Sequence, residues 1–299
     1  QSNSRRRSCI NARRRGTIMT AETEKFKHVL GLSGGKDSSA LAIYMRDNYP
    51  DLDIEYFFTD TGEELEEVYE YLTHLANVLG KPINYLDPER DFKFWMRQYN
   101  NFLPSAQARW CTVRLKLTPF EKWVDEEFLQ KGIKVKSYVA IRSDESFREG
   151  LQSKKEIETV LPFKENHIDK QAVFEILENS GLGLPKYYEW RSRSGCTFCF
   201  FQRKIEWVGL MERHPEAFEN AKRMEKTALD NGSPFTWCQA ESLVELSKPE
   251  RVAQIKADHQ KKIEAAARKR KVNPLRPDDG VVDFDEIYGN QKVCLACHK

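Results

Sequence analysis

The segment HVLGLSGGKDSSALAIYM, residues 28–45, constrains the fold of this chain more than any other. An apolar run gives way to Ser33-Gly34-Gly35-Lys36-Asp37-Ser38, and a helix-forming run follows immediately. This order predicts a strand, a tight turn and a helix whose first backbone N–H groups have no partner within the helix. Two consecutive glycines allow the backbone to approach a ligand closely, and a helix N-terminus favours anions, above all phosphate. The segment therefore predicts a phosphate site in an α/β protein.

The spacing argues against a Walker phosphate loop, which needs a glycine, four further residues and then Gly-Lys-Ser/Thr. Leu30 stands where the first glycine would be, and Asp37 follows Lys36. The segment instead resembles the Ser-Gly-Gly-x-Asp-Ser signature of the PP-loop ATP pyrophosphatases, which split ATP between its α- and β-phosphates and adenylate a substrate. The resemblance implies that residues 33–38 bind ATP, with Lys36 neutralising phosphate charge and Asp37 binding Mg²⁺. The alternative is a tight turn in another α/β protein.

Apolar runs and helical patterns alternate along the first half of the chain. Strands are predicted at KHVLGL, IEYFFTD, PINYL and VKSYVAIR, and a helix over 65–79 should end at Gly80. This alternation over 26–142 predicts an α/β fold with a doubly wound parallel sheet, and the resemblance implies the adenine nucleotide alpha-hydrolase-like (HUP) type. Residues 33–38, Asp60 and Arg142 should then meet at the carboxyl ends of the strands. Asp60 is either a second Mg²⁺ ligand or a plain helix N-terminal residue.

The second half of the chain changes in character from about residue 165. Convincing strands give way to long charged helical patterns such as 203–230 and 241–271. We therefore expect three parts: a leader over 1–18, an ATP-binding α/β domain over 19–164, and a helical region over 165–299 that carries a metal site.

A second group of chemically important residues lies in SAQARWCTVRLKLTP, residues 105–119. Arg109, Arg114 and Lys116 lie within five residues of Cys111, and nearby cations should lower the pKa of a thiol and make it a better nucleophile. The pattern resembles that of the phosphoadenosine-phosphosulfate (PAPS) reductase superfamily. It resembles more closely the ATP pyrophosphatase subunits of DNA phosphorothioation systems, DndC and SspD. The resemblance implies catalytic roles for Lys36, Asp37, Cys111, Arg114 and Lys116. A half-buried cysteine among surface cations is the structural alternative.

The stretch VAIRSDESFREG, residues 139–150, resembles the Gly-x-Arg-x-x-Glu-Ser-x-x-Arg segment of the same superfamily, with Ala140 in place of the glycine. The resemblance implies that Arg142 and Arg148 hold the phosphates of the nucleotide or of the substrate. Solvated surface arginines are the alternative.

The cysteines suggest a metal centre. Two C-x-x-C pairs, Cys196 with Cys199 and Cys294 with Cys297, supply the four thiolates of a tetrahedral Zn²⁺ site or a [4Fe–4S] cluster. A competing ligand set takes Cys111 with Cys196 and Cys199, as resemblance to assimilatory adenylylsulfate reductases suggests. Trp110 replaces one cysteine of that pattern. Cys238 is either a core residue or a spare ligand, and His298 is a further spare.

The charge balance argues against a free-standing DNA-binding protein. The formal net charge is +2, from 48 basic and 46 acidic residues. Residues 1–18 hold six arginines and no acids, so the remainder has 42 basic residues against 46 acidic ones, a net charge of −4. We interpret residues 1–18 as a tag or vector sequence before Met19. With no signal-peptide pattern and no long apolar segment, a cytoplasmic protein without membrane contact is expected.

Three functions follow from these motifs and resemblances. In the first, ATP adenylates a phosphate oxygen of DNA, and sulfur from a cysteine desulfurase, carried on Cys111, displaces AMP; partner subunits would present the DNA. In the second, the enzyme is an assimilatory PAPS or adenylylsulfate reductase, or a tRNA thiolase. In the third, the chain is a non-catalytic nucleotide-sensing subunit. The oligomeric state is left open, with a homo-oligomer as one alternative.

Overall fold

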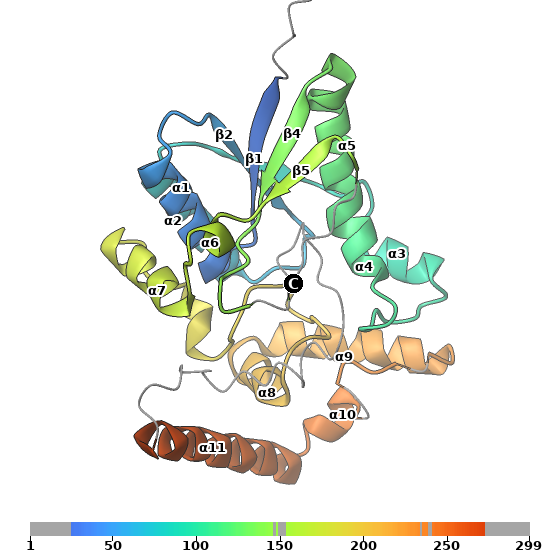
Figure 1. Ribbon diagram of the computed structural model, residues 1–299. Helices are drawn as coiled ribbons and strands as arrows, with labels where there is room; N and C mark the ends of the chain where they lie inside the picture. The colour runs from blue at the N-terminus through green and yellow to red at the C-terminus, as the bar shows by residue number, and fades with distance from the viewer. Residues whose placement is uncertain (1–24, 146–147, 149–153, 234, 239–240, 273–299) are drawn as a thin grey trace, which may run out of the picture.

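Five parallel strands form one sheet in the order β3-β2-β1-β4-β5 (Figure 1). The computed structural model describes residues 25–145, 148, 154–233, 235–238 and 241–272. The strands are β1 (Phe26–Leu32), β2 (Ile54–Thr59), β3 (Ile83–Leu86), β4 (Lys134–Tyr138) and β5 (Ile157–Val160). The order reverses at β1, because the chain moves outward through β2 and β3 and then returns to place β4 on the other side. The doubly wound parallel sheet predicted from the sequence is therefore confirmed.

Helices cover both faces of this sheet. In β1, Leu30 and Leu32 belong to the larger core cluster, together with residues of α1 (Lys36–Asn48) and α2 (Glu66–Leu79). Val29 belongs instead to a second cluster, which includes Phe120 of α5 (Thr118–Glu127). Successive side chains of a strand point to opposite faces, so this partition places α1 and α2 on one face and α5 on the other.

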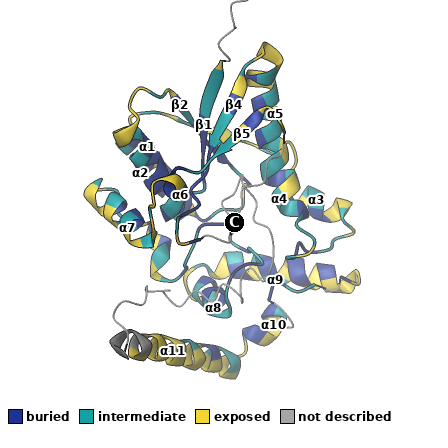
Figure 2. Ribbon diagram, in the orientation of Figure 1, coloured by how far each residue is buried: buried dark blue, intermediate teal, exposed yellow. Residues whose placement is uncertain are grey.

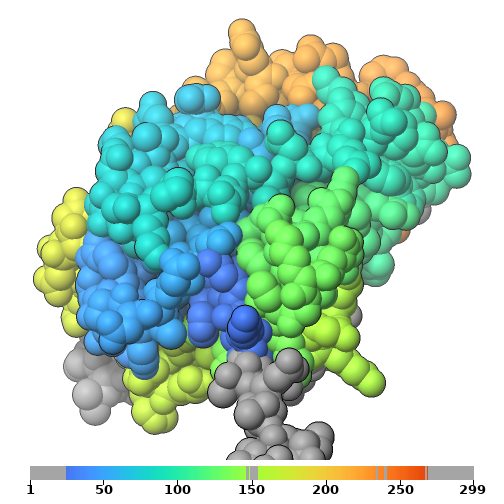
Figure 3. Space-filling view, turned by 90° about the horizontal axis from the view of Figure 1, so that it is seen from above, coloured from blue at the N-terminus to red at the C-terminus, as the bar shows by residue number. Residues whose placement is uncertain are grey.

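The helical C-terminal region lies at the carboxyl ends of the strands (Figure 1). Its α7 packs against α1. The remaining helices are α3 (Phe92–Gln98), α4 (Trp110–Thr112), η1 (Val113–Leu117), η2 (Leu129–Lys131), α6 (Pro162–Glu165), α7 (Lys170–Asn179), η3 (Lys186–Glu189), α8 (Lys204–Arg213), α9 (Pro215–Asp230), α10 (Leu243–Leu246) and α11 (Pro249–Val272). Figure 2 shows α11 largely exposed, whereas α8 and α9 carry buried residues on their inner sides. Figure 3 views the molecule from the opposite end, where the chain enters β1.

The sequence predictions agree with most of these elements. The four predicted strands are present, and α2 ends at Gly80, whose φ of 65° is the left-handed C-cap conformation. The helical pattern over 203–230 is split into α8 and α9 at Pro215, because proline cannot continue a preceding helix. The edge strand β5 was not predicted. The leader over 1–18, Cys294, Cys297 and His298 lie outside the described residues. Within the described part of the chain, every helix is too short or too polar to cross a bilayer.

Candidate functional site

The turn between β1 and α1 requires glycine for steric reasons. Gly34 has a φ of 68°, which L side chains rarely adopt, and a Cβ built there would lie 2.6 Å from Val68 Cγ1. A Cβ on Gly35 would lie 2.8 Å from Ser194 Oγ. The backbone of the 33–38 loop is therefore held close against α2 on one side and against the 194 segment on the other.

Serine hydroxyls fix the shape of this loop from within. Ser38 Oγ accepts a hydrogen bond from Ser33 N at 3.1 Å and lies 3.1 Å from Ser33 Oγ. Ser39 Oγ donates to the Gly35 carbonyl at 2.9 Å. Ser38 and Ser39 are both almost completely buried. These hydroxyls thus help to maintain the loop conformation.

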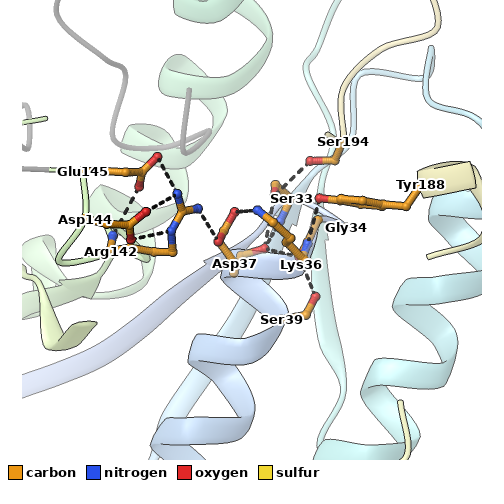
Figure 4. A network of polar contacts seen from close by, with 12 residues as sticks. Ser33, Gly34, Lys36, Asp37, Ser39, Arg142, Asp144, Glu145, Tyr188 and Ser194 are labelled. Carbon is orange, nitrogen blue, oxygen red and sulfur yellow. Dashed lines mark hydrogen bonds and ion pairs between the residues drawn. The ribbon is translucent and has the colours of Figure 1, made fainter. Parts of the chain in front are cut away.

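A buried ion network lies beside the loop (Figure 4). Asp37 accepts from Lys36 Nζ at 2.5 Å through Oδ2 and from an Arg142 terminal nitrogen at 2.8 Å through Oδ1. Burial by itself would raise the pKa of Asp37, but the charges and hydrogen bonds of Lys36 and Arg142 outweigh it and hold that pKa well below its usual range. Burial likewise acts to lower the pKa of Lys36, and the Asp37 charge raises it above its ordinary value. All three groups are therefore charged at neutral pH.

Arg142 connects the two sides of the topological switch point. It follows β4, whereas Asp37 follows β1, and these neighbouring strands are where the order of the sheet reverses. Ligands of open α/β sheets bind in the crevice at that position. Arg142 also pairs with Asp144 through two hydrogen bonds of 2.9 and 3.1 Å. Arg148 is buried and pairs with Glu145 at 2.8 Å, and Glu145 lies 3.6 Å from Arg142, so Glu145 stands between the two arginines in this network.

Asp60 lies at the carboxyl end of β2, as predicted, and closes the turn that follows. Its Oδ1 accepts from Gly62 N at 2.8 Å and from the Tyr69 hydroxyl at 2.7 Å. Burial, and then this hydrogen bond, raise the pKa of Tyr69, which keeps the hydroxyl protonated. Asp60 thus has a structural role in the turn, and its role as a Mg²⁺ ligand stays a prediction.

Cys111 lies half-buried in α4, and the cations around it each have a partner. Arg109 stacks on the Phe201 ring at 5.3 Å, and Arg114 lies 4.7 Å from the Trp95 ring centroid and donates to the Tyr99 hydroxyl at 3.3 Å. The following turns, η1, form a π-helix, which sequence patterns do not reveal. The lowered pKa expected for Cys111 stays a prediction.

Glu64 connects the Cys111 segment to the first C-x-x-C pair. Its side chain is only 2% exposed, and Oε1 lies 3.8 Å from Lys116 Nζ and 3.7 Å from Cys196 Sγ. Thr61 donates to the same oxygen at 3.1 Å. Oε2 is buried and has no hydrogen-bond partner among the described residues. Sequence reasoning missed Glu64 because it is one of four glutamates in EELEE, residues 63–67, and the sequence does not indicate that its side chain is buried.

The segment carrying Cys196 and Cys199 packs against the same site. Ser194 Oγ donates to Ser33 Oγ at 3.2 Å, and the Arg191 guanidinium donates to the carbonyls of Gly195 and Cys196 at 2.9 and 2.7 Å. No three His, Cys, Asp or Glu side chains of the described residues are grouped as metal ligands. The four-thiolate site with Cys294 and Cys297 therefore stays a prediction.

Cys238 is a core residue. It is 4% exposed and belongs to the larger core cluster. Burial, and then the nearby Glu225 charge, raise the pKa of its thiol far above the ordinary value. Of the two alternatives that the sequence allowed, the structure places this side chain in the core.

Tyr187 and Tyr188 were not predicted to belong to the site. The Tyr187 hydroxyl donates to the Gly34 carbonyl at 2.6 Å, and the Tyr188 hydroxyl accepts from Lys36 N at 3.3 Å. These tyrosines are about 150 residues from the loop in sequence, and no local pattern could have indicated the contact.

The comparisons with known proteins agree with the broader of the resemblances, that to the PAPS reductases. Residues 27–169 match the sequence model of the family described as phosphoadenosine phosphosulfate reductase domain. An uncharacterized protein of Methanocaldococcus jannaschii is 27% identical over 206 residues, which cover 67% of this chain and 42% of that protein. The chain thus spans less than half the length of the archaeal relatives that it matches.

Two solved structures show similarity at low sequence identity. The PAPS reductase from Candida auris, in a phosphate complex, is 12% identical, with 60% of this chain and 84% of that chain covered and a TM-score of 0.43. The U34-tRNA thiolase NcsA from Methanococcus maripaludis, with its [4Fe-4S] cluster, is 14% identical, with 70% and 71% covered and a TM-score of 0.39.

Proposed function

We propose that this chain is a PP-loop ATP pyrophosphatase, which adenylates an acceptor oxygen and releases pyrophosphate. The observation that carries the proposal is the 33–38 loop at the switch point of the sheet, with Gly34 at a positive φ, Gly35 packed close to Ser194, and Lys36 and Arg142 as the nearby cations. The match of residues 27–169 to the PAPS reductase domain supports the same class.

The chemistry follows from charge. The attacking oxygen forms a bond to the α-phosphorus of ATP, and the bond to the β-phosphate oxygen breaks, so that pyrophosphate leaves with several negative charges. Lys36 and Arg142 would neutralise part of that charge, and backbone N–H groups of the loop would donate to the phosphate oxygens. Asp37 offers the hard carboxylate oxygens that Mg²⁺ prefers, and the ion would neutralise the remaining phosphate charge. Asp37 would exchange at least one of its present cationic partners for the ion.

The acceptor that we propose is a backbone phosphate of DNA, as in phosphorothioate modification. Adenylation converts an oxygen that leaves poorly into part of AMP, which leaves well. The terminal sulfur of a persulfide on Cys111, supplied by a cysteine desulfurase, would attack the acceptor phosphorus and displace AMP. A thiol must then attack the Cys111 sulfur, which frees the thiophosphate and leaves a disulfide that an external thiol reduces. Partner subunits would present the DNA.

Cys196 and Cys199 would supply two of the thiolates of a metal centre. They lie in one turn, with Cys199 N donating to the Cys196 carbonyl at 3.2 Å, and both are half-buried. Thiolates of this kind suit Zn²⁺ or an iron–sulfur cluster. Such a centre would fix the sulfur-carrying segments next to the nucleotide.

A sulfonucleotide reductase is the second candidate, because the family description that matches residues 27–169 names a reductase domain. The two functions differ in their products. A pyrophosphatase releases pyrophosphate from ATP, whereas a reductase releases sulfite from PAPS or adenylylsulfate in the presence of a thiol reductant.

Pyrophosphate release from ATP with Mg²⁺ tests the proposal directly. We expect Asp37→Ala and Ser38→Ala to abolish it, with circular dichroism showing a folded protein. Asp53→Asn is the matched control, because Asp53 pairs with Lys27 and Lys81 before β2, at the opposite end of the sheet. Wild-type rates in either loop variant would refute the assignment of the loop, and sulfite release from PAPS without pyrophosphate release from ATP would favour the reductase.

A further inference from the structure

The segment over residues 187–194 forms one wall of the 33–38 loop. The Tyr187 hydroxyl donates to the Gly34 carbonyl, and Ser194 Oγ donates to Ser33 Oγ. Tyr188 contacts the backbone N–H of Lys36, which is the first residue of α1. The phosphate loop of the α/β sheet is therefore completed by side chains from the C-terminal half of the chain (Figure 4).

The two neighbouring tyrosines differ in how their hydroxyl protons are used. Tyr187 is 1% exposed, and its hydroxyl proton is donated to a backbone carbonyl, so its role is structural. The Tyr188 hydroxyl is an acceptor in its contact with Lys36 N, at 3.3 Å. A phenol hydroxyl can donate and accept at once. Among the described residues, no group accepts the proton of Tyr188.

The location of this hydroxyl is the second part of the argument. A phosphate held at the N-terminus of α1 must approach the N–H groups of its first turn. Tyr188 lies at the first of those N–H groups, next to the charged pair of Lys36 and Asp37. Burial raises the pKa of Tyr188, so the hydroxyl keeps its proton at neutral pH and remains a donor.

We propose that Tyr188 is a substrate-contacting residue whose hydroxyl donates a hydrogen bond to a phosphate oxygen of the nucleotide bound at the 33–38 loop. The inference rests on the proposed function, which supplies the nucleotide. When the phosphate enters, the Lys36 N–H and the Tyr188 hydroxyl can both donate to it. The C-terminal half of the chain would thus take part in nucleotide binding itself.

Isothermal titration calorimetry with three probes tests this assignment. The probes are α,β-methylene ATP, pyrophosphate and adenosine, which lacks phosphate. For Tyr188→Phe we expect the affinity for the two phosphate-bearing probes to fall roughly tenfold, the effect of one hydrogen bond to a charged acceptor. The affinity for adenosine should not change. Tyr44→Phe is the matched control, because Tyr44 lies on α1 but its hydroxyl bonds with Tyr49 at the C-terminal end of that helix, and it should bind all three probes as the wild type does.

The outcomes separate this inference from the proposed function. Wild-type affinity of Tyr188→Phe for both phosphate probes overturns the role of Tyr188 and leaves the proposed function in place. Failure of the wild-type protein to bind α,β-methylene ATP or pyrophosphate refutes the proposed function and the inference with it. Equal losses for adenosine and pyrophosphate would indicate a structural role and also overturn the inference. If Tyr188→Phe melts early, Tyr188→Met, which removes the hydroxyl and fills much of the same space, repeats the test.

Discussion

Replacement of Asp37 by asparagine should destabilise the protein, because it removes the only carboxylate shared by Lys36 and Arg142 in the described structure. The side chains of Lys36 and Arg142 are 11% and 6% exposed, so both cations would be left mostly buried. Breaking a buried ion pair costs about 3 to 5 kcal/mol of unfolding free energy. Arg142 keeps Asp144, and Asp37 is itself 24% exposed, so we expect about 3 kcal/mol, the low end of that range.

Urea denaturation of the wild type and of Asp37→Asn, followed by circular dichroism, measures this difference in unfolding free energy. In a thermal melt the same difference corresponds to a loss on the order of 8 °C in Tm. The depressed pKa of Asp37 sets its pH dependence. The stabilising contribution is fully present above the unfolded pKa of about 3.9 and is lost as pH falls through the lower folded pKa. The difference should therefore be the same at about pH 8 and about pH 5. A difference under about 0.5 kcal/mol, or one that fades between those pH values, would refute the reasoning.

Three further predictions concern the loop and the cysteines. Gly34→Ala should lower the unfolding free energy by more than about 2 kcal/mol, because the new Cβ clashes with Val68 and the φ is unfavourable for alanine. Gly62→Ala is the control: Gly62 has the same φ but open space around it, so the loss in the same urea assay should be only about 1 kcal/mol. Cys111→Ser should bind ATP normally and transfer no sulfur to the acceptor; loss of metal in this variant would identify Cys111 as a ligand instead. Cys294→Ser and Cys196→Ser should each reduce the zinc or iron content of purified protein, and full metal occupancy in Cys294→Ser would contradict the two-pair site.

Local sequence was enough to predict most of the sheet and the helix after β2. The second half of β1 and the last four residues of β2 are buried runs, as expected of strands at the centre of a parallel sheet, and Gly80 marks the end of α2. The strand β5 escaped prediction because only Ile157 and Val160 of its four residues are apolar, whereas the equally short edge strand β3 has three apolar residues.

The candidate site was predictable only as separate motifs. The glycine turn, Asp60 and Arg142 follow predicted strands, so parallel topology alone places them at one end of the sheet. Tyr188 and Glu64 carry no such signal. Tyr188 reaches the loop from 152 residues away, and Glu64 differs from its acidic neighbours only in being buried against Lys116.

The polar contacts make the 33–38 loop and the Cys196 turn physically dependent on each other. Ser194 bonds to Ser33 in the loop, and two residues later Cys196 lies against Glu64. A substitution that moves the backbone of the Cys196 turn should also move the 187–194 wall of the 33–38 loop, because Arg191 of that wall donates to two carbonyls of the turn. A cysteine variant can therefore lose activity by losing either the thiol or the nucleotide. Nucleotide affinity measured on the same variant distinguishes the two causes, since only the second lowers it.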